Sequence, residues 1–265
     1  MHRIEATMPA PISALLRYLL FALLLLIGTA VVVLWTLPAA YLYQHFDKAL
    51  APLRLQGIDG TLWQGNAAQI SYAAVPLGRL QWTLARTPLL GGSADGELEL
   101  NGAAMVGKSQ FSAQRHRLDL TNTELSFPAS LLAPVLDIPA LVLLGTVSVT
   151  LSAITIEHGI VQSIQGHLVW DQLGVGGAAA ATLGSLRVDF EPRPDGRIIG
   201  RIRDQGGPLR AKGTVELKGQ HYQLEVELDA RAGAEQIRET LLYIGERRAD
   251  GGSLLRVTGN LQKLF

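Results

Sequence analysis

Histidine and serine patterns are the first place to look for catalytic or metal-binding chemistry in this chain. No two histidines are spaced i, i+4 like the ligands of a helical zinc site, and no Gly-x-Ser-x-Gly motif supplies a nucleophilic serine. The chain also lacks cysteine, which excludes disulfides, a thiolate nucleophile, cysteine-ligated zinc and iron–sulfur clusters. We therefore expect no catalytic residues, no metal and no cofactor. The histidines are His2, His45, His116, His158, His167 and His221.

A glycine-rich segment offers a second kind of chemistry. Residues 174–179 (GVGGAA) match the loose G-x-G-x-x-A form of a dinucleotide-binding loop. Such a loop needs a preceding buried strand and a following helix within a βαβ unit. The flanking sequence instead has the pattern of antiparallel strands, so we predict a flexible loop without a nucleotide.

The balance of charge argues against a nucleic-acid partner. Lys and Arg total 23, Asp and Glu total 23, and the net charge of +0 provides no general attraction to phosphates. Basic residues do gather between positions 187 and 212, where a docking surface for acidic partners or anionic headgroups is one interpretation. We favour the other interpretation, the solvated face of a hairpin, because acidic residues are interspersed. The basic residues are Arg187, Arg193, Arg197, Arg201, Arg203, Arg210 and Lys212.

An apolar segment near the N-terminus predicts a membrane anchor. Residues 18–43 contain no charged side chain, and the part up to residue 37 is long enough, at ~1.5 Å per residue, to cross the ~30 Å core of a bilayer. Aromatic rings favour the headgroup level at both ends of such a span. We therefore predict a single transmembrane helix with its membrane-interface residues at Tyr18, Trp35, Tyr41 and Tyr43.

The same segment has a rival interpretation as a cleaved signal peptide, because residues 28–30 (GTA) fit a signal peptidase site. The apolar run continues well beyond the ~7–15 residues of a signal core, so an uncleaved anchor is favoured. A slight excess of basic residues before the span places residues 1–17 in the cytoplasm. Residues 44–265 would then lie in the periplasm of a bacterium.

The rest of the chain has the pattern of β-strands. Apolar and polar residues alternate at 97–100, 118–121, 187–190, 215–218 and 222–228, as in antiparallel strands with one buried face. Glycines precede many of these segments, as at the turns of a meander. We predict a mainly β fold, a mostly antiparallel curved sheet that follows the transmembrane helix.

One or two short helices should interrupt the sheet. Pro128 is suited to the first turn of a short helix, and the apolar residues Ile237, Leu241 and Ile244 recur with helical spacing. The uncharged stretch 138–156 is too polar on alternate residues for a second membrane span. We predict that it is a strand.

A short pattern occurs twice. Residues 78–82 (GRLQW) and 166–170 (GHLVW) share Gly-x-Leu-x-Trp, whose Leu and Trp face the same side of a strand. One interpretation is a duplication, with two similar sub-units and the tryptophans at equivalent places on one face. The other is a chance match in a chain with 28 glycines.

Residues 60–65 (GTLWQG) follow the apolar segment and precede the two Gly-x-Leu-x-Trp segments. The order of these motifs resembles that of the type II secretion system protein N (GspN) family. That family has a Gly-Thr-x-Trp-x-Gly motif after an anchor, then a Trp-containing strand and a later Gly-x-Leu-x-Trp element. The resemblance implies a bitopic inner-membrane component of the apparatus that exports folded proteins across the outer membrane. It implies no catalytic or metal-binding residue, and it gives the matched residues a structural role. They are Gly60, Thr61, Trp63, Gly65, Trp82, Gly166, Leu168 and Trp170.

Three functions remain as hypotheses. The first is a non-enzymatic scaffold that contacts other inner- or outer-membrane secretion subunits and the lipid bilayer. The second is an envelope protein that binds or transfers lipid in an apolar groove of the curved sheet, and the third is a periplasmic hydrolase, which no motif supports. Trp63, Trp82 and Trp170 are expected in the core of the sheet more than at an interface with a partner.

Overall fold

The computed structural model describes residues 12–50, 53–72, 75–86, 91–132, 141–177, 181–241 and 245–260. Four helices lie in these ranges: α1 (Ile12–Trp35), α2 (Ala39–Leu50), the 3-10 helix η2 (Ala129–Leu132) and α4 (Glu235–Leu241). The strands are β1 (Leu53–Gly60), β2 (Gln64–Tyr72), β3 (Val75–Leu84), β4 (Ala94–Asn101), β5 (Val106–Gln114), β6 (Arg117–Pro128), β7 (Leu141–Glu157), β8 (Ile160–Gly177), β9 (Ala181–Pro192), β10 (Arg197–Asp204), β11 (Leu209–Lys218), β12 (His221–Ala230), β13 (Glu246–Arg247) and β14 (Ser253–Asn260).

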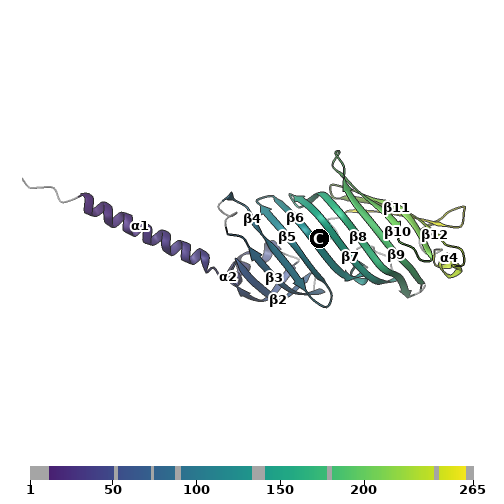
Figure 1. The fold of residues 1–265 in the computed structure, drawn as a ribbon, viewed down its shortest axis with the longest axis horizontal. Helices are drawn as coiled ribbons and strands as arrows, with labels where there is room; N and C mark the ends of the chain where they lie inside the picture. The colour runs from purple at the N-terminus through teal and green to yellow at the C-terminus, as the bar shows by residue number, and fades with distance from the viewer. Residues whose placement is uncertain are drawn as a thin grey trace, which may run out of the picture.

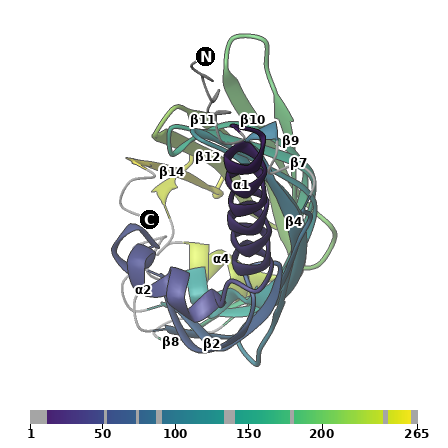
Figure 2. The ribbon, with the colours of Figure 1, turned by 90° about the vertical axis from the view of Figure 1, so that its left-hand side faces the viewer.

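All the strands belong to one open antiparallel sheet. Its 14 strands follow the order of the sequence, except that β14 lies between β12 and β13. The strands cross the long axis of the molecule obliquely (Figure 1), and the sheet curls around this axis so that α4 lies on its concave side (Figure 2). The predicted mainly β, antiparallel and curved architecture is confirmed.

The two faces of the sheet differ sharply in polarity. Residues paired across neighbouring strands form two adjacent rows that run from β1 to β14 and, because successive side chains alternate, point to opposite faces. The apolar row consists of Ile58, Ala67, Leu80, Leu100, Gly107, Leu125, Val149, Leu168, Val188, Ile202, Gly213, Val226 and Leu255. The polar row consists of Asp59, Asn66, Gln81, Glu99, Lys108, Glu124, Thr150, His167, Asp189, Arg201, Thr214, Glu225 and Arg256.

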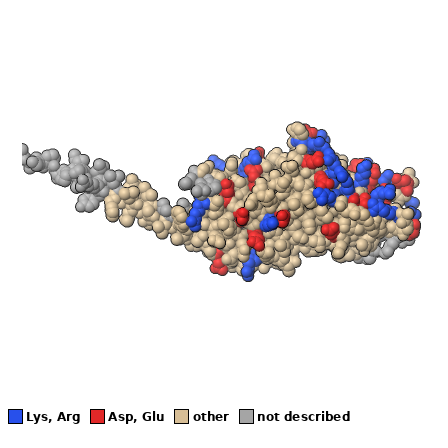
Figure 3. All heavy atoms as spheres, in the orientation of Figure 1, with Lys and Arg blue, Asp and Glu red and all other residues tan. Residues whose placement is uncertain are grey.

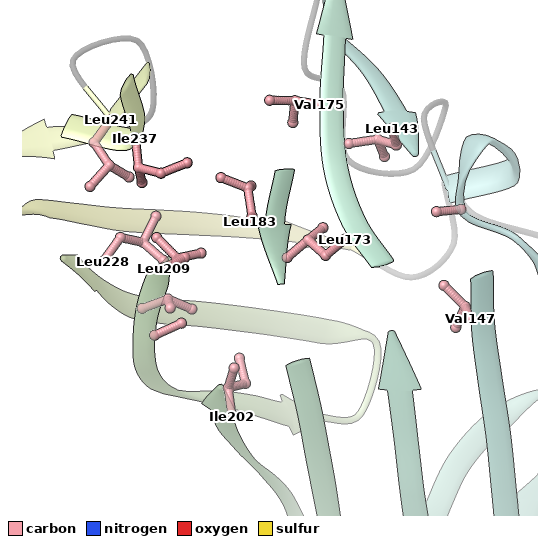
Figure 4. Packing of buried hydrophobic residues seen from close by; sticks show 13 residues of the cluster. Leu143, Val147, Leu173, Val175, Leu183, Ile202, Leu209, Leu228, Ile237 and Leu241 are labelled. Atoms are coloured by element: carbon pink, nitrogen blue, oxygen red, sulfur yellow. The ribbon is translucent and has the colours of Figure 1, made fainter. Parts of the chain in front are cut away.

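The core lies on the concave side of the C-terminal half. Ile237 and Leu241 of α4 face Leu183, Leu209 and Leu228 of the sheet (Figure 4), and all five side chains are buried in one cluster. The cluster also contains residues of the apolar row in β10 and β12, so the apolar row marks the concave face. Among the described residues of β1–β5, none belongs to this cluster. The N-terminal half of the concave face is therefore apolar but outside this cluster, although Ala67 and Ile70 of β2 are buried.

The short helices and the strand over residues 138–156 were predicted correctly. Helix η2 follows directly after Pro128, α4 carries Ile237 and Leu241, and β7 spans Leu141–Glu157. Ile244 and residues 138–140 lie outside the described residues.

The prediction of a flexible loop at residues 174–179 was wrong for its first four residues. Residues 174–177 continue strand β8, and Gly174 and Val175 are buried. Gly174 pairs with Leu144 of β7, and a Cβ atom on Gly174 would lie 3.1 Å from the carbonyl oxygen of Ala181 in β9. The glycine thus allows a close approach of the neighbouring backbone, which is one of the uses of glycine within a strand. Residues 178 and 179 lie outside the described residues.

The uncharged run of residues 18–43 is divided between two helices. Helix α1 ends at Trp35 and α2 begins at Ala39, because a helix rarely continues through the residue before a proline, here Pro38. Large apolar side chains of α1 are 48% to 68% exposed, with Ile27 and Phe21 at the two limits. None of the helices in the described ranges is both long enough and apolar enough to cross a membrane. The transmembrane anchor therefore stays a prediction.

Candidate functional site

The joint between the helices and the sheet is the first candidate site. The amide of Leu62, in the β1–β2 turn, donates a hydrogen bond to the carbonyl of Leu37 at 2.9 Å, and Pro38 forms a β-bridge with Thr61. The hydroxyl of Tyr43 in α2 accepts a hydrogen bond from the amide of Leu55 at 3.1 Å. These contacts attach the α1–α2 connection to the first hairpin of the sheet.

The Gly-Thr-x-Trp-x-Gly residues build the turn that receives this connection. Gly60 has φ +90°, a conformation that glycine adopts most easily, and the hydroxyl of Thr61 accepts a hydrogen bond from the amide of Gln64. Trp63 is only 5% exposed. A Cβ atom on Gly65 would lie 2.4 Å from Cζ2 of Trp82. Five of the residues that carry the family resemblance therefore form one structural unit: Gly60, Thr61, Trp63, Gly65 and Trp82.

An arginine outside that motif completes the joint. The guanidinium carbon of Arg86 lies 4.6 Å from the ring centroid of Trp35 and 5.8 Å from that of Trp63, which is the geometry of a cation–π interaction. Arg86 follows β3 and thus connects the end of α1 with the buried ring. No sequence motif includes it, and only its position shortly after Trp82 could have drawn attention to it.

The predicted membrane-interface residues differ in their exposure. Trp35 is 51% exposed and Tyr41 is 57% exposed, whereas Tyr43 is half-buried against β1. Tyr18 belongs to α1, but its side chain is outside the described residues.

The second motif has the same local geometry at a distant place. Gly78 and Gly166 have φ of +136° and +141°. The indole of Trp82 donates to the carbonyl of Leu62 at 3.1 Å, and the indole of Trp170 donates to the carbonyl of Leu144 at 3.0 Å. In both motifs a positive-φ glycine and a tethered indole fix the strand to its neighbour.

The two tryptophans lie on strands of opposite direction. Leu80 and Leu168 lie in the same apolar row, but β3 and β8 run in opposite directions because an odd number of antiparallel steps separates them. Trp82 and Trp170 therefore lie on opposite sides of that row but on the same face of the sheet. Two similar sub-units with an odd number of strands each would have this arrangement, and the duplication stays a prediction.

Replacement of either tryptophan by phenylalanine tests the role of the indole N–H. Trp82→Phe and Trp170→Phe each keep an aromatic ring but lose the hydrogen bonding of the indole, which is shared between the carbonyls of Thr61 and Leu62 for Trp82 and goes to the exposed carbonyl of Leu144 for Trp170. We expect each to lower the free energy of unfolding by about 1 kcal/mol, measured by urea denaturation of the full chain in detergent. A loss near zero for both variants would show that these hydrogen bonds do not stabilise the sheet.

The convex face is polar and many of its charges are paired. Figure 3 shows charged residues of both signs on this face, most densely toward β9–β12. Lys108 pairs with Glu124 at 3.2 Å, and Arg201 pairs with Glu191 at 2.9 Å. Arg197 pairs with both Asp195 and Glu216, which agrees with the interpretation of the basic stretch as a solvated hairpin face.

Hydrogen bonds hold several carboxylates of the sheet in the ionised form. Those from Arg117 and Thr155 lower the pKa of Asp119, and those from Arg197 lower the pKa of Asp195. At Asp204 burial opposes ionisation, but bonds from Arg231 and two backbone amides outweigh it and lower the pKa. A lowered pKa keeps these groups as anions at neutral pH, so they serve ion pairing rather than proton transfer.

A hollow of about 770 Å³ lies over β3–β7, lined mainly by residues of the polar face. Its side chains bond to one another: Gln110 donates to Glu97 at 3.0 Å, and Asn122 donates to the Oε1 of Gln110 at 2.9 Å. These hydrogen bonds bring no nucleophile together with a base. The polar side chains that line the hollow satisfy one another.

The histidines do not build a metal centre within the described ranges. His116 and His158, at the tips of two neighbouring hairpins, stack with ring centroids 5.0 Å apart. No group of three or more His, Asp or Glu side chains among the described residues is placed to hold a metal ion. His2 lies outside the described residues.

Comparison with known proteins identifies the family of the chain. The sequence profile of the family described as type II secretion system (T2SS), protein N, matches residues 51–256. The chain belongs to the type II secretion system protein N family. A curated relative, type II secretion system protein N of Aeromonas hydrophila, is 25% identical over 257 residues, covering 91% of this chain and 98% of the relative.

A second member of the protein N family gives a higher identity over a shorter range. Type II secretion system protein N of Vibrio cholerae serotype O1 (strain ATCC 39315 / El Tor Inaba N16961) is 40% identical over 63 residues, which is 21% of this chain and 25% of that protein. No solved structure matches the chain. Membership identifies the protein as a component of the type II secretion system.

Proposed function

We propose that the chain is a non-enzymatic scaffold of the type II secretion system in the inner membrane, anchored by residues 18–43 with its sheet in the periplasm. Family membership supports the assignment to secretion. The observation that carries the scaffold role is the joint at Trp35, Trp63 and Arg86. It ties the end of an exposed apolar helix to the first hairpin of the sheet.

A fixed joint suits a scaffold better than a flexible linker would. Since α2 and the β1–β2 turn hold the connection by backbone hydrogen bonds, the orientation of the helix constrains that of the sheet. Other secretion subunits in the same membrane would meet the sheet at high effective concentration, so each contact can be weak. The polar face, many of whose charges are already paired, suits such weak contacts with proteins.

Deletion of the gene tests the secretion role. We expect secreted enzymes to accumulate in the periplasm of the deletion strain instead of the medium, and the wild-type gene to restore export. Protease added to spheroplasts should digest residues 44–265 and spare residues 1–17. Normal export in the deletion strain, together with no cross-link to any secretion subunit, would overturn the proposal.

A pair of double variants tests the anchor separately. Leu25→Arg combined with Leu26→Arg places two charges in the middle of the predicted span, where each costs about 3 kcal/mol in membrane insertion. We expect this variant to leave the membrane fraction and to fail in complementation. Gln44→Glu combined with His45→Glu, just beyond the span, also adds two charges, but of the sign that has little influence on membrane orientation, and should behave like the wild type.

A further inference from the structure

The N-terminal half of the concave face is apolar yet incompletely covered. The large apolar inward side chains of β3–β6 are half-buried, whereas Ile202 and Val226 in the same apolar row are 6% and 5% exposed. Exposure of apolar surface to water costs about 25 cal/mol of free energy per Å². A continuous apolar face across four strands therefore indicates a binding surface. We name it the N-terminal apolar face, and its large side chains are Leu80, Trp82, Leu84, Leu98, Leu100, Phe111, Leu118, Leu120 and Leu125.

The chemistry of this face restricts what can bind to it. Its inward hydroxyls, those of Ser109 and Thr123, hydrogen-bond each other at 2.8 Å, and the indole of Trp82 is bonded to the β1–β2 turn. A peptide on this face would therefore leave its backbone amides and carbonyls without partners, at a cost of several kcal/mol. A hydrocarbon chain has no such groups to satisfy.

One end of the face carries a cation. Arg86 follows Leu84 by two residues, and its contacts in the described part of the chain are the indole rings of Trp35 and Trp63 rather than a carboxylate. Trp35 is the last residue of α1, the helix with exposed apolar side chains. An anion attached to a hydrocarbon chain would meet both Arg86 and the apolar face.

We propose that the N-terminal apolar face binds the acyl chains of a membrane phospholipid, with the phosphate at Arg86. This goes beyond the proposed scaffold role, and neither requires the other. The acyl chains would lie across the apolar row of β3–β6. The core packed by α4 in the C-terminal half would close the far end.

Single-cysteine reporters test the location of the lipid. The chain has no native cysteine, so Leu98→Cys and Glu99→Cys each give one labelling position. These neighbours on β4 point to opposite faces of the sheet. The full chain, labelled with an environment-sensitive fluorophore, is reconstituted into vesicles of phosphatidylethanolamine and phosphatidylglycerol that contain phospholipid with a nitroxide on its acyl chain. Flotation of the vesicles reports on the anchor independently.

We expect the nitroxide to remove most of the fluorescence at position 98 and little at position 99. Equal quenching at both positions would mean that the label merely lies close to the bilayer. A blue-shifted but unquenched label at position 98 would mean that a segment of the chain itself covers the face. Either result would overturn the proposal, as would a label at position 98 with the spectrum of a dye in water.

Arg86→Gln tests the phosphate site, with Arg79→Gln on β3 as its control. Arg79 is exposed and points to the convex face. We expect Arg86→Gln to reduce the preference of the face for phosphatidylglycerol over diacylglycerol, which has the same acyl chains but no phosphate, by about fivefold, the effect of a charge pair of about 1 kcal/mol. The control should leave the preference unchanged. An equal reduction in both variants would assign the preference to general surface charge.

Discussion

Gly166→Ala is expected to lower the free energy of unfolding by about 3 to 5 kcal/mol, although it adds only one methyl group. Gly166 has φ +141°, which side chains other than glycine rarely adopt. A Cβ atom there would also lie 2.3 Å from the carbonyl oxygen of Thr150 and 2.6 Å from the Cα of Leu151. Both obstacles are backbone atoms of β7, so β7 and β8 must separate locally.

Gly159→Ala is the matched control for this variant. Gly159 lies in the turn between the same two strands with φ +74°, but a Cβ atom there would meet nothing within 4 Å. We expect a loss of only about 1 kcal/mol from backbone strain. Urea denaturation of both full-length variants, followed by tryptophan fluorescence, measures the difference. Equal losses would mean that the collision with β7 is relieved without cost, and the motif glycine would then have no special role.

The alternation of polar and apolar residues was enough to predict the fold, but not the register. Segments such as 97–100 and 222–228 have period 2 over their own length, which identifies a strand and its two faces. The apolar row depends on which residues pair between neighbouring strands. The pairing includes irregularities such as the register shift between Lys108 and Gln110 where β5 pairs with β6. A one-residue slip at any hairpin would have broken the row.

The site was predictable only where its residues are close in sequence. Gly60, Thr61, Trp63 and Gly65 build one turn, so a short motif could indicate them. Arg86 acts through rings 23 and 51 residues earlier in the chain, at Trp63 and Trp35, and the sequence contains no pattern for such a contact. The opposite direction of the two Gly-x-Leu-x-Trp strands was unpredictable for a similar reason, since it depends on the number of strands between them.

Leu209→Ala and Leu98→Ala should differ in cost although both remove a leucine from the concave face. Leu209 is 3% exposed and packs in the core near Ile237 and Leu241, so its loss leaves a cavity and should cost about 3 kcal/mol. Leu98 is half-buried on the N-terminal apolar face, outside that cluster, and its loss should cost about 1 kcal/mol. Urea denaturation of the full chain in detergent compares the two, with Glu99→Ala on the convex face as a variant expected to change little.

The comparison of the two stability losses shows whether the N-terminal apolar face is covered by protein. It therefore tests a premise of the lipid proposal without adding lipid. If an unassigned part of the chain covered the N-terminal apolar face, Leu98 would be as enclosed as Leu209 and the two losses would be equal. Unequal losses mean that the curved sheet has two halves of different character. The half beneath α4 would be stabilised by its own core, and the half next to α1 would keep an apolar surface that needs a ligand. Addition of phospholipid should then raise the stability of the wild type more than that of Leu98→Ala, because a ligand stabilises the state to which it binds.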